Sequence, residues 1–481
     1  MTGSWAERAV AVSIGVLLTI VAGLVLLPGL RFGPSLDASV FTIVADRLRA
    51  GDVPYRDLFD HKPPGIFLFD AAVQSLVGGS AWSGSWVGSV LALGLTGALA
   101  GSIAVRSSAS IGTRRLSDSL ALRVGVGLLT VTFLGAPRLA LGGGMTEAVG
   151  ALPAAASVWA ALCGSAGGRG ATWWFVAAGA FASAAVATSF FFAPVVVAAG
   201  ILGWGAAHRT LAYLAGLALV AAALALWLVA AGAMPAAIDA LIGFNAAYIG
   251  VSLGDPRGTA TGALLAIAPL LAAAVAFSFM HRPSRLSLAL VAWCAMSVLQ
   301  LILPGRFATH YLLPVVLPLC LLAAMGVASL GHRAGLLAGS VLAAASVVIM
   351  VSQVGSPVPQ QPLRSATIGL GEWLQRNTEP TDRILVWDRL PQVYLTAQRA
   401  PAGRFIHRGA LRIPEYARSA TAEWIRGLEA DLPAAIIVLK RQWGPGEASA
   451  ALRALVSASY VELPEVAGRR IFVPADRNGG D

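Results

Sequence analysis

Residues 9–27 read AVAVSIGVLLTIVAGLVLL, a run of nineteen residues that contains no charge. An α-helix of about this length crosses the hydrocarbon layer of a membrane. The run is longer than the apolar part of a cleaved signal peptide, and the residues that follow it, PGLR at 28–31, contain no A-x-A-like cleavage site. It is therefore predicted to be a first membrane span that the mature protein keeps.

The whole chain has the composition of a protein that lies mostly in lipid. Of its 481 residues 57% are hydrophobic and 12% are charged, and the mean hydropathy is +0.74, whereas about a quarter of the residues of a soluble domain are charged. The apolar residues form long uncharged runs without the alternating pattern of a membrane β-barrel. The sequence predicts a polytopic α-helical membrane protein with about eleven spans. Their approximate bounds are Ala9–Leu27, Trp86–Val105, Leu120–Ala136, Ala148–Cys163, Trp173–Thr188, Phe191–Trp204, Leu211–Ala233, Ala263–Met280, Leu286–Leu303, Leu312–Leu330 and Leu336–Val351.

Charges in the connections between spans predict the orientation of the chain. If the spans alternate in direction, eight arginines of the connections fall on one side: Arg106, Arg114, Arg115, Arg169, Arg209, Arg282, Arg285 and Arg333. By the positive-inside rule this side is the cytoplasm, so the N-terminus is cytoplasmic and the protein is predicted to lie in the plasma membrane. Most carboxylates before residue 354 fall on the other side: Asp37, Asp46, Asp52, Asp57, Asp60, Asp70, Glu147, Asp239 and Asp255. Acids contribute little to topology, so this clustering favours an extracytoplasmic site that needs carboxylates.

Two outer loops are long enough to hold structure of their own. In the first loop, Arg31–Ser85, the apolar residues Val40, Phe41, Val44 and Leu48 have helical spacing, which predicts an amphipathic juxtamembrane helix. The second loop, Met234–Gly262, has a similar but weaker pattern. The region between Trp173 and Trp204 is predicted either as one long helix or as two short ones broken near Pro194.

Residues 354–481 differ from the apolar core at 1–353. They have an ordinary charge density and a mixed helix and strand pattern, which predicts a small α/β domain. Helices are expected at Arg364–Arg376, Pro414–Glu429 and Ala448–Ser457, and strands at Arg383–Trp387, Ala434–Leu439 and Arg470–Val473. An odd number of spans makes this domain extracytoplasmic. Its ionisable candidates Asp382, Asp388 and His407 are scattered, so it is predicted to help bind an acceptor rather than to perform chemistry.

The first outer loop contains the segment DLFDHKPPG at 57–65. It joins two acids, a histidine and one of only two lysines in the chain to a rigid Pro-Pro-Gly turn. Because the prolines restrict the backbone, the ammonium of Lys62 is held at the membrane surface, where it suits a lipid phosphate. The alternative is an interfacial loop whose charges merely face water.

Three further segments fall on the same outer side as Lys62 in this topology. They are Asp37 after the first span, GGGMTE at 142–147 with Glu147, and PGRFATHY at 304–311 with Arg306. Each has an ordinary alternative: Glu147 in the first turn of a helix, Arg306 and Tyr311 as interface anchors, and His310 as a structural histidine. Their convergence on one side favours a shared site.

In these segments the chain resembles the C-type glycosyltransferase superfamily, most closely its protein O-mannosyltransferase-like and lipid A aminoarabinose transferase group. The family pattern of an acid, a helix, G-x-x-P-Y and then KPP is present as Asp37, Gly51–Tyr55 and Lys62–Pro64. Residues 142–147 correspond to the second outer-loop acid, and residues 304–311 to an Arg/His-Tyr element before a late span. The resemblance covers roughly residues 1–353. The chain departs from the family at Ala38 and His61, where an acid is common, and at TSFFF (188–192), where a basic residue is common.

The resemblance implies a glycosyltransferase that moves a hexosyl or pentosyl group from a polyprenyl-phosphate donor to an extracytoplasmic glycan, lipid or protein, with inversion. Asp37 is then the expected general base, and Glu147 a second catalytic residue. The donor phosphate is expected to bind Lys62, Arg306 and His310. Tyr55, Asp60, His61 and Tyr311 are expected to position the substrates. A divalent metal ion is left open as a cofactor, with His61, Asp60 and His310 as candidate ligands.

Other functions fit the sequence less well. A transporter or flippase usually has ionisable residues at mid-membrane and repeated halves, whereas these spans hold almost no charges and show no repeat. A non-catalytic membrane scaffold is the second alternative. The net charge of +10 comes mostly from arginines between spans and is accompanied by no nucleic-acid recognition motif. Cys163, Cys294 and Cys320 have no metal-ligand spacing and are predicted to be buried apolar residues.

Overall fold

The membrane part is a bundle of apolar helices. The computed structural model describes residues 5–109, 116–249, 284–302, 308–329, 364–387, 389–439 and 443–479, with a few further positions between 267 and 348. Nine of the predicted spans coincide with described helices: α1 (Trp5–Phe32), α4 (Ala81–Ala109), α5 (Leu116–Leu134), α7 (Thr146–Ser165), α8 (Ala171–Thr188), α9 (Ala193–Gly203), α10 (Ala207–Ala230), α14 (Arg285–Ile302) and α15 (Leu313–Ser329). Seven described helices are long and apolar enough to cross a membrane, and α5 and α9 belong to shorter apolar helices. The polytopic membrane fold is thus confirmed. The predicted spans 263–280 and 336–351 lie largely outside the described residues.

The region between Trp173 and Trp204 forms two helices with a break close to Pro194, as the second alternative predicts. Helix α8 ends at Thr188, Ser189 is extended, and residues Phe190–Phe192 form a 3₁₀ turn before α9 begins. Pro194 lies in the first turn of α9, where a backbone N–H has no acceptor within the helix and proline costs nothing.

Small residues let neighbouring helices approach closely, as is common in membranes. A side chain at Gly179 of α8 would collide with the carbonyl of Tyr213 on α10, and one at Gly216 of α10 would collide with the carbonyl of Val176 on α8. The two helices therefore touch through their backbones, which explains two glycines in otherwise strongly apolar runs.

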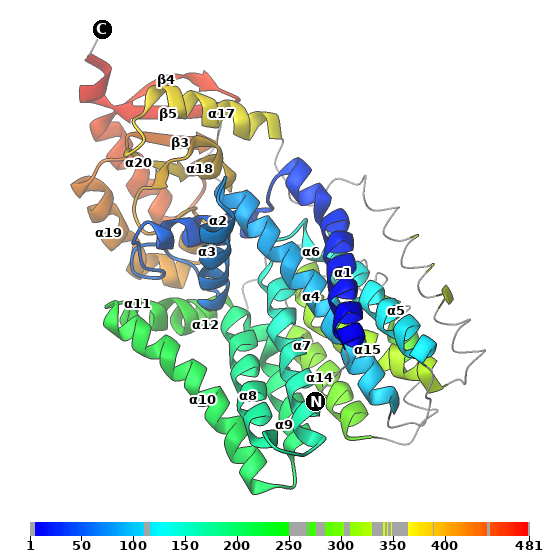
Figure 1. Cartoon of the computed structure of the whole chain (residues 1–481). Helices are drawn as coiled ribbons and strands as arrows, with labels where there is room; N and C mark the ends of the chain where they lie inside the picture. The colour runs from blue at the N-terminus through cyan, green and yellow to red at the C-terminus, as the bar shows by residue number, and fades with distance from the viewer. Residues whose placement is uncertain are drawn as a thin grey trace.

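The long outer loops fold between the bundle and the tail (Figure 1). The first contains α2 (Leu36–Arg49) and α3 (Gly65–Val77). The apolar side of α2 is buried in protein, with Val40, Phe41 and Val44 nearly inaccessible, so this helix is more enclosed than the predicted helix at the membrane surface. The second loop continues α10 through α11 (Met234–Ile238), a π-helical turn (Asp239–Phe244) and α12 (Asn245–Tyr248).

The tail contains a five-stranded sheet in the order β2-β1-β3-β5-β4. Strands β1, β2 and β3 are parallel, whereas β5 is antiparallel to β3 and to β4. The elements are α17 (Arg364–Asn377), β1 (Arg383–Trp387), α18 (Gln392–Ala397), β2 (Ala400–Pro401), α19 (Pro414–Ala430), β3 (Ala435–Leu439), α20 (Glu447–Ser459), β4 (Tyr460–Val466) and β5 (Arg469–Pro474). All six predicted elements are present, and α18, β2 and β4 were not predicted. Strand β4 contains Pro464, which a sheet tolerates here because β4 is an edge strand.

Arg404 fastens the tail to both outer loops. Its guanidinium donates to the carbonyl of Tyr55 at 2.7 Å and pairs with Asp239 at 3.2 Å, and its own carbonyl accepts from the N–H of Phe59 at 2.7 Å. The ring of Phe59 packs against the tail residues Phe405 and Tyr416. The tail therefore covers the first outer loop through hydrogen bonds as well as apolar contacts.

Connections between the described spans fall at two ends of the bundle (Figure 1). The outer loops and the tail lie at one end. The other end has the connections that carry Arg106, Arg169, Arg209 and Arg285, and the guanidinium of Arg285 donates to the carbonyl of Trp204 at 3.1 Å. The remaining arginines of the predicted cytoplasmic set (114, 115, 282 and 333) lie outside the described residues. Which end faces the cytoplasm stays a prediction of the positive-inside rule.

We expect an impermeant thiol reagent to label Ser457→Cys in intact cells, because Ser457 is exposed on α20 in the tail. Arg169→Cys, in the connection between α7 and α8, is the matched control and should react only after permeabilisation. The native Cys163 and Cys320 are buried and Cys294 is half-buried, so the background is expected to be low. The reverse labelling pattern would invert the topology.

Candidate active site

The backbone around Lys62 is held by its own loop. Asp60 accepts a hydrogen bond from the N–H of Lys62 at 2.7 Å, and the hydroxyl of Tyr55 donates to the carbonyl of Lys62 at 2.8 Å. Tyr55 itself has a positive φ of 71°, a conformation that non-glycine residues adopt at a cost and that often marks a functional turn. Pro63 and Pro64 then lead directly into α3. The backbone N–H and the backbone carbonyl of Lys62 are therefore both held by hydrogen bonds within the loop.

The ammonium of Lys62 forms a buried ion pair with Glu147. Nζ lies 3.3 Å from Oε1 of Glu147, which also accepts from the hydroxyl of Ser189 at 3.0 Å. Lys62 is 8% exposed and Glu147 is fully buried. Burial lowers the pKa of Lys62, but the carboxylate of Glu147, followed by Tyr311, Asp37 and Asp60, raises it by more, so the net pKa is above its usual range. Lys62 is therefore a permanent cation.

Three glycines before Glu147 allow the close approach that the ion pair needs. Gly142, Gly143 and Gly144 have φ angles of 83°, 107° and 75°, a region that favours glycine. A side chain at Gly144 would also collide with Ala38 in the first turn of α2. The GGG run thus brings the start of α7 against the start of α2, which carries Asp37.

Two aromatic rings lie over the lysine. Nζ of Lys62 is 5.1 Å from the ring centre of Tyr311 and 5.9 Å from that of Phe191, and the two rings stack with 4.2 Å between their centres. His310 packs edge-on against Tyr311 at 4.4 Å. The rings stabilise the cation and keep water away from it.

Two buried polar atoms beside this cluster have no hydrogen-bond partner among the described residues. They are Oε2 of Glu147 and Nδ1 of His310, which is 5% exposed. His310 lies close enough to Glu147, Asp37 and Lys62 to interact with their charges. Buried polar groups are rarely left unsatisfied, so these atoms indicate a position for a polar ligand.

Asp37 lies at the edge of the cluster. It is in the first turn of α2, whose N-cap Ser35 accepts from the N–H of Ala38 at 3.3 Å. The carboxylate is half-buried and accepts no hydrogen bond from the described residues, but it interacts electrostatically with Lys62 and His310. The side chain is thus an accessible, unengaged carboxylate.

The candidate metal ligands are not gathered. Oδ1 of Asp60 is engaged by the N–H of Lys62, and the ring of His61 packs against Phe244 and Tyr248 at 5.2 and 5.5 Å. Across the described residues, no group of three His, Cys, Asp or Glu side chains could hold a metal ion. A ligand set of Asp60, His61 and His310 therefore does not fit. Arg306 lies outside the described residues.

The site also contains four residues to which the sequence analysis assigned no role in it. Ser189 and Phe191 belong to the TSFFF segment, where the departure from the family pattern was the available signal. Asn245 donates to the carbonyl of His61 at 3.1 Å and braces the loop. His407 of the tail is near enough to Asp37 for their charges to interact, although burial lowers the pKa of His407 to about 4 and keeps it neutral. No local pattern indicated the last two.

We expect Asp60→Asn to flatten the pH dependence of stability. Burial raises the pKa of Asp60 to about 7, against 3.8 in an exposed carboxyl, although its hydrogen bond from the Lys62 N–H and the charge of Lys62 oppose this. The stabilisation that comes from the raised pKa is present below pH 4 and is lost as the pH rises to about 7. The melting temperature of the wild type should therefore fall between pH 5 and pH 7.5.

Asn keeps the shape and the acceptor of Asp60 but cannot titrate, so part of this slope should disappear. The slope should not vanish, because burial also raises the pKa of Asp70 to about 7. Asp57→Asn is the control, since hydrogen bonding to Arg56 lowers the pKa of Asp57. An unchanged slope in Asp60→Asn would contradict the assignment.

The chain has the fold of the C-type membrane glycosyltransferases, so the predicted resemblance is confirmed at the level of the fold. No family model and no curated protein matches the sequence. The structure of ArnT from Cupriavidus metallidurans in the apo state is similar with a TM-score of 0.60 and 15% identity, covering 99% of each chain. ArnT bound to undecaprenyl phosphate has the same TM-score at 13% identity over the full length of both chains.

Two other similar structures extend the comparison. The archaeal oligosaccharyltransferase AglB from Archaeoglobus fulgidus, in complex with an inhibitory peptide and a dolichol-phosphate, has a TM-score of 0.53 at 12% identity, covering 98% of this chain and 75% of that one. The mycobacterial arabinofuranosyltransferase AftD has a TM-score of 0.54 at 15% identity, covering 95% of this chain but 40% of that one.

Proposed function

We propose that this protein is a membrane glycosyltransferase that transfers a sugar from a polyprenyl-phosphate donor to an extracytoplasmic glycan, lipid or protein. The observation that carries the proposal is the cluster around Lys62. A buried cation, two buried polar atoms without a hydrogen-bond partner in the described part of the chain, and a carboxylate that accepts no hydrogen bond there converge from four distant segments at one end of the bundle. The similar structures of ArnT and AglB, which contain undecaprenyl phosphate and dolichol-phosphate, support a lipid-phosphate donor.

The proposed reaction is a single displacement. Asp37 accepts the proton of an acceptor hydroxyl as its oxygen attacks the anomeric carbon. The bond from that carbon to the phosphate oxygen breaks through an oxocarbenium-like state, and polyprenyl phosphate leaves with the bonding electrons. Lys62 and His310 stabilise the charge that builds on the phosphate, and Arg306 is assigned the same role from the sequence. Attack opposite the leaving group inverts the anomeric carbon.

Glu147 receives a different role from the one that the sequence suggested. Its carboxylate oxygen Oε1 is already engaged by two partners, the ammonium of Lys62 and the hydroxyl of Ser189. We assign it to positioning the ammonium rather than to accepting the proton from the acceptor. Asp37, which has no such partner among the described residues, is the better base.

The remaining candidate residues are proposed to hold Lys62 and its loop in position. Tyr55 and Asp60 hold the backbone of Lys62, Tyr311 covers its ammonium, and His61 anchors the loop through Asn245. No step uses a metal ion, because the candidate ligands do not fit one. One of the similar Archaeoglobus oligosaccharyltransferase structures is a complex with Zn and sulfate. Transfer assays before and after treatment with EDTA therefore test whether this chain needs a metal.

The tail, residues 354–481, is proposed to be an extracytoplasmic domain that helps to bind the acceptor. Asp37 acts on the pKa of His407 in the tail, and Arg404 fixes the tail over the loop that carries Lys62. These contacts support a tail that closes the acceptor side of the site.

Transfer of radiolabelled sugar in proteoliposomes tests the proposal. Purified protein should move label from a polyprenyl-phosphate sugar to an envelope extract, with release of polyprenyl phosphate in equal amount. A transporter would move the labelled lipid across the bilayer without cleaving it, and a scaffold would do neither. Intact donor after incubation with a panel of polyprenyl-phosphate sugars and extracts would refute the enzymatic function.

A further inference from the structure

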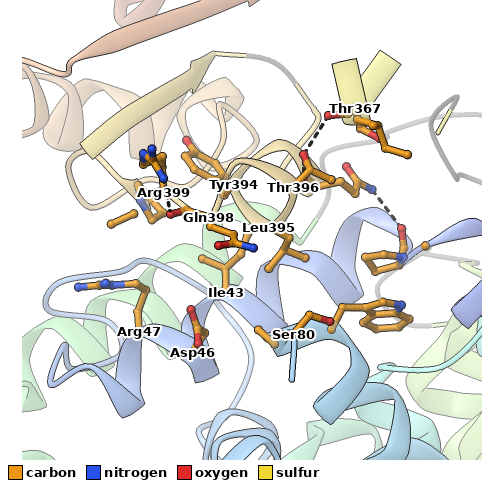
Figure 2. Close-up of a pocket in the computed structure, with 18 of the residues that line it drawn as sticks. Ile43, Asp46, Arg47, Ser80, Thr367, Tyr394, Leu395, Thr396, Gln398 and Arg399 are labelled. Atoms are coloured by element: carbon orange, nitrogen blue, oxygen red, sulfur yellow. Dashed lines mark hydrogen bonds between the residues drawn. The ribbon is translucent and has the colours of Figure 1, made fainter. Parts of the chain in front are cut away.

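A cavity lies between α2 and the tail. Its volume is about 890 Å³, which is within the usual range for small-molecule sites. Ile43, Asp46 and Arg47 of α2 form one side, and Tyr394, Leu395 and Thr396 of α18 lie across from them (Figure 2). Ser80 and Trp82, before and within the start of α4, form part of the wall. None of the residues around Lys62 lines this cavity.

The cavity is on the face of α2 that points away from the candidate active site. Asp37 and Asp46 are nine residues apart, which is two and a half helical turns, so their side chains leave α2 on opposite sides. The cavity and the candidate active site are nevertheless connected through two contacts. The amide nitrogen of Gln392, in the cavity wall, donates to the carbonyl of Pro34 at 3.2 Å, next to the N-cap of α2. Trp82 also approaches Gly144, in the glycine run before Glu147.

The charged residues that line the cavity already have partners. Arg47 pairs with Asp52 at 2.7 Å, and Asp46 pairs with Arg49 at 3.3 Å. The guanidinium of Arg399 is surrounded by acceptors: the hydroxyl and carbonyl of Thr378 and the carbonyls of Gln375, Ala397 and Gln398. Arg383 donates to the carbonyl of Pro401 and interacts with the charge of Asp57. An anionic ligand would therefore find the N–H groups of the Arg399 guanidinium already engaged.

Gln392 presents the unsatisfied group. It is 5% exposed, and its Oε1 has no hydrogen-bond partner among the described residues, while its Nε2 is fixed by Pro34. A carbonyl oxygen needs a donor, which a hydroxyl group supplies and an ionised phosphate or carboxylate does not. Ile43, Leu395 and Trp82 add apolar surface on which the C–H face of a sugar ring can lie. A few fixed polar groups between apolar walls are typical of a site for a neutral ligand.

We propose that this cavity binds an uncharged saccharide, the glycan part of the acceptor. This identity of the ligand rests on the proposed function, because a glycosyltransferase needs to hold its acceptor beyond the single hydroxyl that reacts. Binding here would keep the glycan against the loop that presents Asp37. Residues of α2 and of the tail both line the cavity. A saccharide bound there would therefore contact the tail, which is proposed to help bind the acceptor.

The test measures saccharide binding separately from transfer. The full-length protein in phospholipid nanodiscs is titrated with mannotriose, arabinotriose and cellotriose, and binding is followed by saturation-transfer difference NMR. Inorganic phosphate and soluble phosphatidylglycerol are added as competitors. At least one neutral trisaccharide should bind, and neither anionic competitor should displace it.

Two variants locate the binding. Thr381 is exposed at the cavity rim, so Thr381→Trp should fill the entrance and weaken saccharide binding tenfold or more. Ser457→Trp, equally exposed but away from the cavity, should bind as the wild type does. Gln392→Met has a similar size and lacks the acceptor, and should weaken binding by about tenfold. Binding that Thr381→Trp and Gln392→Met leave unchanged, or that inorganic phosphate displaces, would overturn the proposal.

The transfer assay separates this proposal from the proposed function. If the protein transfers sugar but binds none of the trisaccharides, the cavity proposal alone fails. If the trisaccharides bind as described but the lipid donor is never cleaved, the proposed function fails, and with it the identification of the saccharide as an acceptor. In an active protein, Thr381→Trp should raise the KM for acceptor while leaving kcat within about twofold.

Discussion

Asp37→Asn is expected to lower the rate of sugar transfer by about two to four orders of magnitude, the usual contribution of a general base. Asn keeps the size of the side chain and its place at the start of α2 but cannot accept the proton of the acceptor hydroxyl. Binding of polyprenyl phosphate, measured by calorimetry, should change little because the base faces the acceptor. Initial rates of transfer in proteoliposomes give the measurement.

Asp46→Asn is the matched control for this prediction. It makes the same change in the same helix, but on the face opposite Asp37, where Asp46 pairs with Arg49 and lines the cavity between α2 and the tail. It should retain kcat within about twofold at saturating acceptor, because it leaves the proposed base in place, and any effect on acceptor binding would appear in the KM for acceptor. A folded Asp37→Asn protein with near wild-type activity would show that the base is another residue, and Glu147 would be tested next.

Lys62→Ala is expected to abolish donor binding and transfer together and also to destabilise the protein. The phosphate that Lys62 binds is present in both the ground state and the transition state, so the loss affects binding as well as turnover. The removal of the ammonium leaves Glu147 fully buried without a countercharge, which costs about 3–5 kcal/mol of folding stability. Thermal unfolding and calorimetry measure the two effects.

The double variant Lys62→Ala/Glu147→Gln separates the two losses. Gln keeps the acceptor for Ser189 but carries no charge, so stability should recover while transfer does not. Lys62→Arg is a further control that keeps the charge but changes its shape, and it should retain stability better than transfer. Transfer that returns with stability in the double variant would show that Lys62 acts only as a structural partner of Glu147.

The helices could be predicted from the sequence because their signal is local. An uncharged run such as residues 9–27 is stable in the hydrocarbon layer of a membrane, and nine of the predicted spans coincide with described helices. Proline accounts for two details. The break expected near Pro194 lies at residues 189–192, and Pro194 itself is in the first turn of α9, where proline is compatible with a helix. Strand β4 was missed because Pro464 is disfavoured in a strand unless the strand lies at an edge.

The candidate site divides in the same way. The sequence by itself determined which residues were chemically unusual: a rare lysine before a Pro-Pro turn, an acid after three glycines and an acid after the first span. Only the tertiary structure decided what each one contacts. It paired Lys62 with Glu147, 85 residues away, and on this contact rests the proposal that Glu147 positions the ammonium of Lys62.

The cavity between α2 and the tail was decided by tertiary structure alone. Gln392 follows no motif, and its amide meets Pro34 across 358 residues of sequence. The physical reason is the range of the interactions. Hydropathy and turn preferences act between near neighbours and can be read along the chain, whereas an ion pair, an unsatisfied amide or a cavity depends on which distant backbones pack together.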